Sequence, residues 1–301
     1  MLKGQKILIT GATGKIAFPI ARALARDNEV WGVARLTDAK QRQRLVDIGV
    51  KPLSLDLARG DLSSLPPDFH YVFHAAVDPG MNDWIACEKT NAQRSADLLH
   101  HCRSAKGFVF CSTGSIYAYQ GRKPLQESDP PGVPLRANYS FSKVAAESAC
   151  TWVANHFGIP LTIIRVFSTY GPLGGTAADR LEAILQRKPI RVHPDQPNNY
   201  HPIYEDDYVE LGIRAMEIAR TPPVVVNWGG SELVSIEEYC QYLGELVGIE
   251  PIFDYTPQAH TPMVPDVTRM HELLGRTKVH WRDGMRRMVK ALHPELKLSD
   301  E

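Results

Sequence analysis

Short apolar runs alternate with helical segments through the first part of this chain, and this alternation limits its fold more than any other feature. Between residues 6 and 167 the runs KILIT, EVWGVAR, KPLSLDL, YVFHAAV, GFVFCST and LTIIRVF each have the length of a buried strand. Segments with a helical pattern, such as AFPIARALARD and YSFSKVAAESACTWVANHF, lie between them. Because strands joined by helices pair in parallel through right-handed crossovers, the sequence predicts an α/β fold with a doubly wound parallel sheet.

The pattern changes after residue 168. There, proline and glycine separate short pieces such as YGPLGG and RTPPVVVNWGGSELVS, although aliphatic and aromatic residues continue to occur. We therefore predict a sheet domain over residues 1–168 and a smaller, loop-rich C-terminal lobe over residues 169–301. A helix at 203–220 is expected to return to the first domain.

Charge and cysteine content narrow the functional classes. Lysine plus arginine and aspartate plus glutamate each total 34 among 301 residues, so neither nucleic acid nor an anionic membrane is expected as a partner. No apolar run approaches the length of a transmembrane helix, and the N-terminal apolar stretch is too short for a signal peptide. The five cysteines are scattered, without a C-x-x-C pair. We expect a cytoplasmic protein with reduced thiols and no metal site.

The first predicted strand is followed by a glycine motif, ITGATGKIA at residues 9–17. Gly11 permits a tight turn, Gly14 lets the backbone approach a pyrophosphate at a helix N-terminus, and Ala17 is the third small residue, where helix and strand pack closely. A glycine-rich turn without a ligand is the alternative interpretation. The position at the start of a strand–turn–helix unit favours a Rossmann-type dinucleotide site.

The end of the second predicted strand bears on which dinucleotide is bound. NAD enzymes commonly place an acidic residue there to bind the adenine ribose 2′-hydroxyl, whereas this strand ends in Ala34 and Arg35. A guanidinium can bind a 2′-phosphate through two hydrogen bonds, although Arg35 could also be an ordinary surface residue. The sequence thus favours NADP(H) over NAD(H).

A tyrosine and a lysine stand four residues apart in NYSFSKVAAE, residues 138–147, within a predicted helix. Lys143 lies one turn beyond Tyr139, so its ammonium can favour the phenolate of a hydroxyl whose ordinary pKa is about 10. Such a spacing also occurs by chance on amphipathic helices. The pair alone does not distinguish a proton donor from two structural residues.

The motifs occur in an order that resembles the extended short-chain dehydrogenases/reductases, also called the NAD-dependent epimerase/dehydratase family. The resemblance covers nearly the whole chain. It is carried by TGATGKIA, Asp56 in LSLDL, HAA at 74–76, Asn91 in KTNAQRSADLL, STGSIY at 112–117, YSFSK at 139–143, RVFSTYGP at 165–172, IYEDDYVELGIRA at 203–215 and VVNWGGSELVSIEEYCQYLGELVG at 225–248.

Together with the positions of the motifs, the resemblance implies roles for single residues. The expected catalytic residues are Thr113, Tyr139 and Lys143. Besides Arg35, cofactor contacts are expected from Gly11, Thr13, Gly14, Lys15, Ile16, Asp56, Leu57, Ala75, Ala76, Val77, Tyr139, Lys143, Val166, Phe167 and Ser168. Substrate contacts are expected from Ser112, Thr113, Ser115, Ser168 and His201. Family members commonly form homodimers in which two long helices of each copy, here 90–103 and 139–157, build a four-helix bundle.

One departure from the family concerns the residues after the catalytic threonine. Members that dehydrate nucleotide sugars carry Asp-Glu there as an acid–base pair, and the related decarboxylases also use that glutamate. In this chain Thr113 is followed by Gly114 and Ser115. Both reactions are therefore disfavoured.

Other departures concern the substrate. Nucleotide-sugar enzymes of the family commonly have an asparagine where this chain has Ser168. They often carry an arginine, which binds the substrate diphosphate, just before the strand that leads into V-D-D, where this chain reads NNYHPIYEDD. Arg180, Arg187 or Arg191 could substitute for it.

Two functions of different classes remain. The first, which we expect, is an NAD(P)-dependent oxidoreductase that transfers a hydride between the nicotinamide and a small alcohol or ketone lacking a nucleotide. The alternative is a nucleotide-sugar epimerase that keeps NAD bound and returns the hydride to the opposite face. A structural protein that merely binds the cofactor is disfavoured by the complete Thr–Tyr–Lys set.

Overall fold

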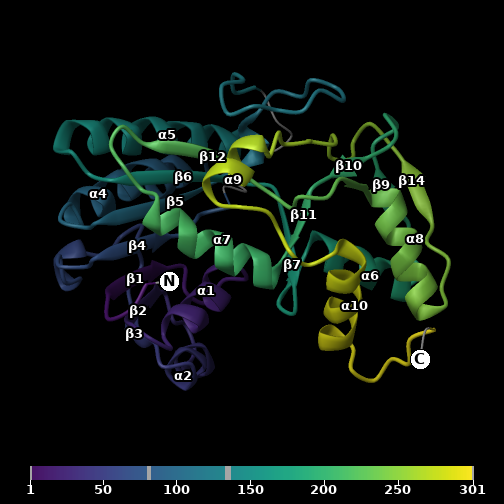
Figure 1. Ribbon diagram of the computed structural model, residues 1–301, viewed down its shortest axis with the longest axis horizontal. Coiled ribbons are helices and arrows are strands. Elements are labelled where there is room, and N and C mark those ends of the chain that lie inside the picture. The colour runs from purple at the N-terminus through teal and green to yellow at the C-terminus, as the bar shows by residue number, and fades with distance from the viewer. Residues whose placement is uncertain (1, 80–82, 133–136, 300–301) are drawn as a thin grey trace. The chain divides into compact units, whose positions relative to one another are not determined.

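The structure is a computed structural model that describes residues 2–79, 83–132 and 137–299 (Figure 1). The chain divides into two compact units, each made of more than one segment. The first unit consists of Met1–Ile116, Arg136–Arg165 and Val209–Val226, and the second of Tyr117–Leu135, Val166–Tyr208 and Asn227–Glu301.

The first unit contains the predicted alternation of strands and helices. In chain order its elements are β1 (Lys6–Thr10), α1 (Ala17–Leu24), β2 (Glu29–Ala34), α2 (Ala39–Asp47), β3 (Lys51–Ser54), the 3-10 turn η1 (Leu62–Ser64), β4 (Tyr71–His74), α3 (Trp84–Glu88), the π-helical turn η2 (Lys89–Gln93), α4 (Arg94–His101), β5 (Gly107–Thr113), the 3-10 turn η3 (Gly114–Ile116), α5 (Ala137–Phe157) and β6 (Leu161–Val166). The boundary between the units falls at the last residue of β6 and within α7 (Glu205–Glu217) and β12 (Val224–Trp228).

Seven strands form one sheet in the order β12-β6-β5-β4-β1-β2-β3. β1 pairs in parallel with both β2 and β4, so that Ile7 lies between Val30 and Tyr71. The pairs β2–β3 and β4–β5 are also parallel. The strand order therefore reverses between β1 and β4, and ligands of doubly wound sheets bind at the carboxyl ends of the strands beside such a reversal. The predicted Rossmann-type fold class is confirmed.

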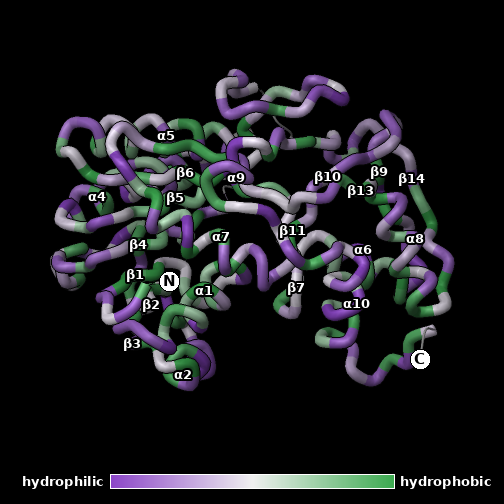
Figure 2. The backbone as a smooth tube through the Cα atoms, viewed as in Figure 1, coloured by the Kyte–Doolittle hydropathy of each residue, from purple (hydrophilic) through white to green (hydrophobic). Residues whose placement is uncertain are grey.

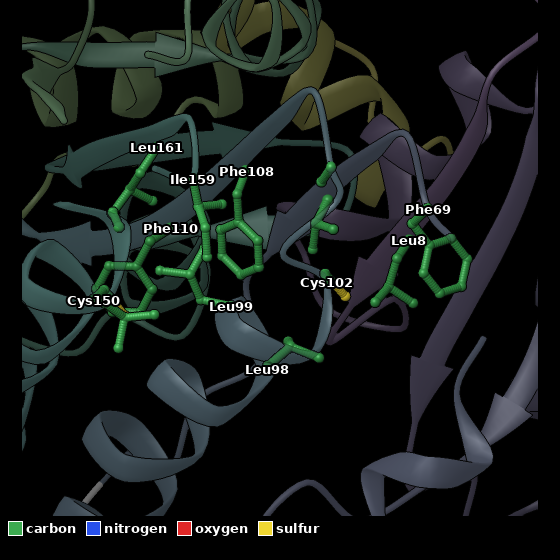
Figure 3. Close-up of a cluster of buried hydrophobic side chains, with 14 of the residues drawn as sticks. Leu8, Phe69, Leu98, Leu99, Cys102, Phe108, Phe110, Cys150, Ile159 and Leu161 are labelled. Carbon is green, nitrogen blue, oxygen red and sulfur yellow. The ribbon is translucent and has the colours of Figure 1, made fainter. Parts of the chain in front are cut away.

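A hydrophobic core packs α4 and α5 against the sheet (Figure 3). Leu8 of β1 and Phe108 of β5 are fully buried in this cluster together with Leu99 of α4 and Cys150 of α5. Burial raises the pKa of the Cys150 thiol to about 12, so this cysteine acts as a small hydrophobic residue. By contrast, α2 is largely hydrophilic (Figure 2) and buries Leu45.

Helix α7 approaches β5 closely enough to require a glycine. A Cβ at Gly107 would stand 2.3 Å from the carbonyl oxygen of Met216 on α7. Any larger residue at position 107 would push the helix away from the sheet. This contact lies within the first unit.

The predicted helix over 90–103 has an irregular start. α3, the π-helical turn η2 and α4 follow one another without a break. Asn91 lies in the π-helical turn and is buried. Single π-helical turns are frequent at functional sites, and the contacts of Asn91 described below give this one a structural role. The second expected helix, over 139–157, is observed as α5.

Among its described residues, the second unit contains short strands and four helices that lie wholly within it. One sheet has the order β11-β7-β8, and two-stranded sheets pair β10 with β13 and β14 with β9. A separate core of apolar residues holds α6, α8 and α10 together, with Leu181, Leu243 and Met285 fully buried. The elements are β7 (Ser168–Gly171), β8 (Gly174–Gly175), α6 (Thr176–Leu185), β9 (Ile190–Val192), β10 (Asn199–Tyr200), β11 (Pro202–Tyr204), β13 (Val234–Ser235), α8 (Ile236–Val247), β14 (Phe253–Tyr255), α9 (Thr268–Leu273) and α10 (Trp281–Leu292).

In the part of the chain that the structure describes, every helix is too short or too polar to cross a membrane.

Candidate cofactor and catalytic site

The glycine loop joins β1 to α1 and lies against the segment that follows β4. Gly11 has a φ of +66°, a conformation that side chains disfavour. A Cβ at Gly11 would stand 2.9 Å from the backbone nitrogen of Ala76, and one at Gly14 would stand 3.0 Å from the carbonyl oxygen of Gly11. α1 begins at Ala17, and the side chain of its N-cap residue Ile16 makes no capping hydrogen bond. Such a glycine-lined start of a helix fits a pyrophosphate.

A buried histidine fixes the segment after β4. His74 is 3% exposed, its Nδ1 lies 2.6 Å from Thr10 Oγ1, and its Nε2 lies 2.8 Å from Ser95 Oγ. Because Ser95 Oγ donates its proton to the Asn91 carbonyl, Nε2–H donates to Ser95 and Nδ1 accepts from Thr10. Thr10 Oγ1 in turn accepts from the Ala76 N–H at 3.1 Å. Burial lowers the pKa of His74 to about 3, so the imidazole is neutral.

Asn91 extends these hydrogen bonds to the start of α5. Its side-chain amide donates to the Asp78 carbonyl at 2.9 Å and to Ser142 Oγ at 2.9 Å, and its side-chain carbonyl accepts from the Asp78 N–H at 2.8 Å. Ser142 Oγ donates to the carbonyl of Tyr139 at 2.7 Å. One side chain therefore fixes both the loop after β4 and the turn of α5 that carries Tyr139.

Lys143 links α5 to β5. It is 2% exposed, its Nζ donates to the Cys111 carbonyl at 2.6 Å, and Nζ lies 4.2 Å from the centre of the Phe110 ring. Burial lowers the pKa of Lys143 to about 8. At neutral pH the side chain is still mainly an ammonium, so it supplies positive charge beside the strand that ends in Thr113.

Three hydroxyl groups connect the end of β5 with α5. Ser115 Oγ lies 3.1 Å from Thr113 Oγ1 and 3.0 Å from Ser140 Oγ. Ser140 is fully buried and follows the half-buried Tyr139 directly. The structure thus brings Thr113, Ser115 and the turn of Tyr139 together, and Ser140 is a member of this group that the sequence did not indicate. Ser112 is buried on β5, and its Oγ finds no hydrogen-bond partner among the described residues.

The other residues of the first unit that were expected to contact the cofactor follow the carboxyl ends of strands. Arg35 is exposed directly after β2, and its carbonyl accepts from Ser54 Oγ at 2.9 Å. After β3, Asp56 is exposed and accepts from the Ala58 N–H at 3.0 Å, while Leu57 is buried. The remaining expected positions lie in the loops after β1 and β4: Thr13, Lys15, Ala75 and Val77.

A buried ion pair joins α5, the helix that carries Tyr139 and Lys143, to β6. Glu147, one turn beyond Lys143, accepts from Arg165 Nε at 3.0 Å and from Arg165 Nη2 at 2.8 Å. Both side chains are about nine-tenths buried, at 10% and 11% exposure. Sequence reasoning missed this pair because two charges 18 residues apart on different elements produce no local pattern.

In the second unit, the three residues expected to contact the cofactor stand at the end of β6 and the start of β7: Val166, Phe167 and Ser168. The Phe167 N–H donates to the Trp228 carbonyl at 3.1 Å. Ser168 is buried, and its Oγ lies 3.2 Å from Thr176 Oγ1. The hydroxyl of Ser168 is therefore directed to the first residue of α6.

His201 is held by backbone contacts. It is buried, its Nδ1–H donates to the Gly230 carbonyl at 2.8 Å, and the Gly230 N–H donates to the His201 carbonyl at 2.8 Å. Burial lowers the pKa of His201, so its imidazole is neutral above mildly acidic pH. Among residues 2–79, 83–132 and 137–299, no group of three or more His, Cys, Asp or Glu side chains is arranged to hold a metal ion.

Known proteins resemble the chain in sequence as well as in fold. The model of the NAD dependent epimerase/dehydratase family matches residues 7–229. A Bacillus subtilis (strain 168) protein described as an uncharacterized UDP-glucose epimerase is 30% identical over 276 residues, which span 81% of this chain and 83% of that protein. The UDP-N-acetyl-alpha-D-glucosaminuronate decarboxylase of Bacillus cytotoxicus is 26% identical over 315 residues, which span 95% of this chain and 97% of that protein.

Among solved structures, UDP-glucuronic acid 4-epimerase from Bacillus cereus in complex with NAD has a TM-score of 0.81 at 25% identity, covering 96% of each chain. Its cofactor is NAD, so it gives no support to the NADP(H) preference expected from Arg35. These relatives also accord better with the epimerase alternative than with the expected oxidoreductase of simple alcohols and ketones. The chain belongs to the NAD-dependent epimerase/dehydratase family, within the extended short-chain dehydrogenases/reductases.

Proposed function

We propose that this protein is an NAD-dependent epimerase that inverts C4 of a UDP-linked hexose or hexuronic acid. The relatives described above include a UDP-glucuronic acid 4-epimerase and a protein described as a UDP-glucose epimerase. The observation that carries the proposal is the arrangement after Thr113. Gly114 and Ser115 stand there, and Ser115 Oγ contacts the hydroxyls of Thr113 and Ser140. Without a carboxylate at these two positions, dehydration and decarboxylation lack their acid–base group, and reversible oxidation of one carbon remains.

NAD fits the first unit. The glycine loop would hold its pyrophosphate, Asp56 and Leu57 would lie beside its adenine, and the segment 75–77 would lie beside its centre. When bound, NAD accepts a hydride from the substrate carbon and gives it back. The exposed guanidinium of Arg35 can remain in solvent beside a ribose without a 2′-phosphate, so its presence is compatible with NAD.

Tyr139 and Lys143 would move the proton. The phenolate of Tyr139 takes the proton of the C4 hydroxyl as the carbon is oxidised to a ketone, and Thr113 orients the same oxygen. The buried ammonium of Lys143 favours the phenolate by charge. Once the ketone had turned over in the site, Tyr139 would return the proton to the oxygen as the hydride is given back, and the hydroxyl at C4 would be inverted.

The two units divide the work in this proposal. The first binds the cofactor and carries Tyr139, and the second binds the substrate, as expected for the lobe over 169–301. Ser168 and His201 are the substrate contacts that we assign to the second unit, and Ser112 and Ser115 are those of the first. The main competing function, an oxidoreductase of simple ketones, needs no inversion and no nucleotide.

We also propose a homodimer that pairs α4 and α5 of two copies. Trp152 and Phe141 on α5 are 62% and 40% exposed, and Ile85 on the adjoining α3 is 74% exposed. His100 of α4 lies 4.5 Å from Phe157 of α5 between ring centroids, so the aromatic surface spans both helices. Apolar side chains exposed in this way are typical of a surface that a second copy covers. Light scattering of Trp152→Glu tests the assignment, since a dimer of the unmodified protein should become a monomer.

The function is tested by incubating the protein and NAD with UDP-glucose or UDP-glucuronic acid and following the sugar by NMR. We expect the C4 epimer to accumulate to the same equilibrium mixture from either direction, without accumulation of NADH. Tight retention of NAD, seen as absorbance of the purified protein, would agree with this. NADPH-dependent reduction of simple ketones, with no conversion of any UDP-sugar, would contradict the proposal.

A further inference from the structure

Three arginines of the second unit differ in their surroundings. Arg191 is exposed, and its Nε lies 3.9 Å from Asp254 Oδ2. Arg187 is exposed in the turn after α6. Arg180 stands within α6 and is half-buried. Of these three cations, Arg180 is the one held inside the fold.

Arg180 uses little of its capacity for hydrogen bonds. Its Nη1 donates to the Thr176 carbonyl at 3.2 Å, and its guanidinium carbon lies 5.6 Å from the centre of the Tyr239 ring. Within the described ranges of the chain, no carboxylate lies at ion-pair distance from it. A guanidinium has five N–H donors and remains charged at any physiological pH.

Two tyrosines beside Arg180 do not balance its charge. Burial raises the pKa of the Tyr200 and Tyr239 hydroxyls, and the charge of Arg180 opposes that shift in both. Both side chains are therefore neutral phenols. Although burial lowers it, the pKa of Arg180 is raised overall by neighbouring groups that include Tyr239 and Asp179. The guanidinium therefore stays charged, and its unused N–H donors can bind an anion.

Arg180 is linked to both substrate positions at which this chain departs from its family, to Ser168 through Thr176 and to Tyr200 by its charge. Thr176 accepts from Arg180 through its carbonyl, and its Oγ1 lies 3.2 Å from Ser168 Oγ. Ser168 replaces the asparagine that contacts the substrate. Tyr200, whose pKa responds to Arg180, lies in NNYHPIYEDD, where the arginine for the diphosphate is missing. The cation absent from one position is thus present nearby on α6.

We infer that Arg180 binds the diphosphate of the substrate. This inference rests on the proposed function, since it takes the substrate to be a nucleoside diphosphate sugar. The planar guanidinium can bond two phosphate oxygens at once, and its half-buried position reduces screening by salt.

Calorimetry with UDP, uridine and inorganic pyrophosphate tests the inference. We expect Arg180→Met to weaken UDP binding by about 30-fold or more, because it removes one partner of a partly buried charge pair. Pyrophosphate binding should be lost, and uridine binding should be unchanged. Arg180→Lys should lose part of the affinity for UDP, because it keeps the charge without the paired donors. Arg187→Met, at an exposed arginine just after the same helix, is the matched control and should stay within about twofold of the unmodified protein.

Several outcomes would overturn the inference. UDP affinity of Arg180→Met within about twofold of the unmodified protein would do so, as would a parallel loss of uridine binding. If Arg180→Met fails to fold by circular dichroism, Arg180→Lys decides, and unchanged UDP affinity in that variant overturns the inference.

A separate assay of epimerisation distinguishes failure of the role of Arg180 from failure of the proposed epimerase function. An active epimerase whose KM for the UDP-sugar does not change in the Arg180 variants refutes the role of Arg180 alone. An inactive protein that binds pyrophosphate through Arg180 refutes the epimerase and supports the anion site.

Discussion

The two units differ in how clearly short stretches of their sequence indicate the residues of their sites. In the first unit, the glycine loop, the HAA segment and the Tyr-x-x-x-Lys pair each occupy a short continuous stretch, and hydrogen bonds through His74 and Asn91 join these stretches. In the second unit, Ser168, Arg180 and Tyr200 come from three different elements. Cofactor sites of this fold depend on backbone geometry, which leaves a compact sequence motif, whereas substrate sites depend on side chains that fold together from distant positions.

The buried side-chain hydrogen bonds of the second unit also differ from those of the first, because they lie apart from the proposed site residues. Asn198 is fully buried, donates to Glu237 Oε1 at 2.8 Å and donates to the His193 carbonyl at 2.8 Å. Tyr117 donates to the side chain of Asn227 at 2.7 Å. These bonds join loop residues to α8 and β12 and involve none of the residues assigned to the substrate. On the proposed assignments, a change at Tyr139 of the first unit should alter turnover, and a change at Arg180 of the second should alter UDP binding.

The largest expected effect is that of Tyr139→Phe. Loss of the hydroxyl removes the proposed proton acceptor, and positioned acid–base groups contribute about 10²- to 10⁴-fold in rate, so kcat should fall by that factor. Affinities for NAD and UDP, measured by calorimetry, should be unchanged. Tyr255→Phe, at an exposed position in the second unit, is the control and should retain full turnover. Near-normal turnover of Tyr139→Phe would refute the proposed proton transfer by Tyr139.

The next effect concerns the stability of the first unit. Glu147→Gln leaves Arg165 without its buried carboxylate, and breaking a buried pair in this way costs about 3–5 kcal/mol of unfolding free energy, measured by urea titration. Glu210→Gln breaks a more exposed pair with Arg214 and should cost less than about 1 kcal/mol. Equal losses in the two variants would show that burial of the Glu147–Arg165 pair does not matter.

A smaller effect is expected from acid. The pKa of His74 is about 3 in the folded protein, whereas a histidine of the unfolded chain has its ordinary pKa of about 6.5. Between these values the unfolded chain binds a proton that the folded chain excludes. The unfolding free energy should therefore fall as pH decreases below about 6.5, by about 2 kcal/mol from this group between about pH 7 and pH 5. His74→Gln should lose that much less on acidification, while His156→Gln on α5 should behave as the unmodified protein. The same acid loss in His74→Gln and in the unmodified protein would contradict the assignment.

The smallest effect is expected at the adenine ribose. We expect the unmodified protein to bind NAD at least as tightly as NADP. Arg35→Asp should leave NAD binding unchanged or improved and weaken NADP binding by about tenfold, since an acidic side chain repels the 2′-phosphate. Fluorescence titration with both reduced cofactors measures the difference, with Arg42→Asp on α2 as the control. Tighter binding of NADPH by the unmodified protein would restore the preference that Arg35 indicated.

Much of the first unit follows from its sequence for physical reasons. Strand and helix periodicity predict the sheet, and Gly11 marks a turn that only a residue without a side chain adopts easily. Neither periodicity nor spacing indicates that Asn91 lies in a π-helical turn, or that its side-chain amide donates a hydrogen bond to Ser142. The pair of Glu147 and Arg165 and the contact of Ser140 with Ser115 also depend on tertiary packing.

The expected NADP(H) preference and the expected ketone substrate find no support among the relatives, for a related reason. Both rested on single residues, Arg35 and Ser168, judged without their surroundings. Arg35 is exposed, so its guanidinium can remain in solvent and does not oppose the binding of NAD. Ser168 contacts Thr176, and the same residue accepts a hydrogen bond from Arg180, a cation on another element that we propose binds the diphosphate.

The central claim, that hydride leaves and returns to the same sugar carbon, is tested most directly with UDP-glucose and UDP-glucuronic acid that carry deuterium at C4. Mass spectrometry of the separated products then reports the fate of the label. An epimerase that keeps its cofactor bound should give the C4 epimer with the deuterium retained. Deuterium found in free reduced cofactor, with a deuterium-free sugar product, would contradict the account and assign the protein to the oxidoreductases.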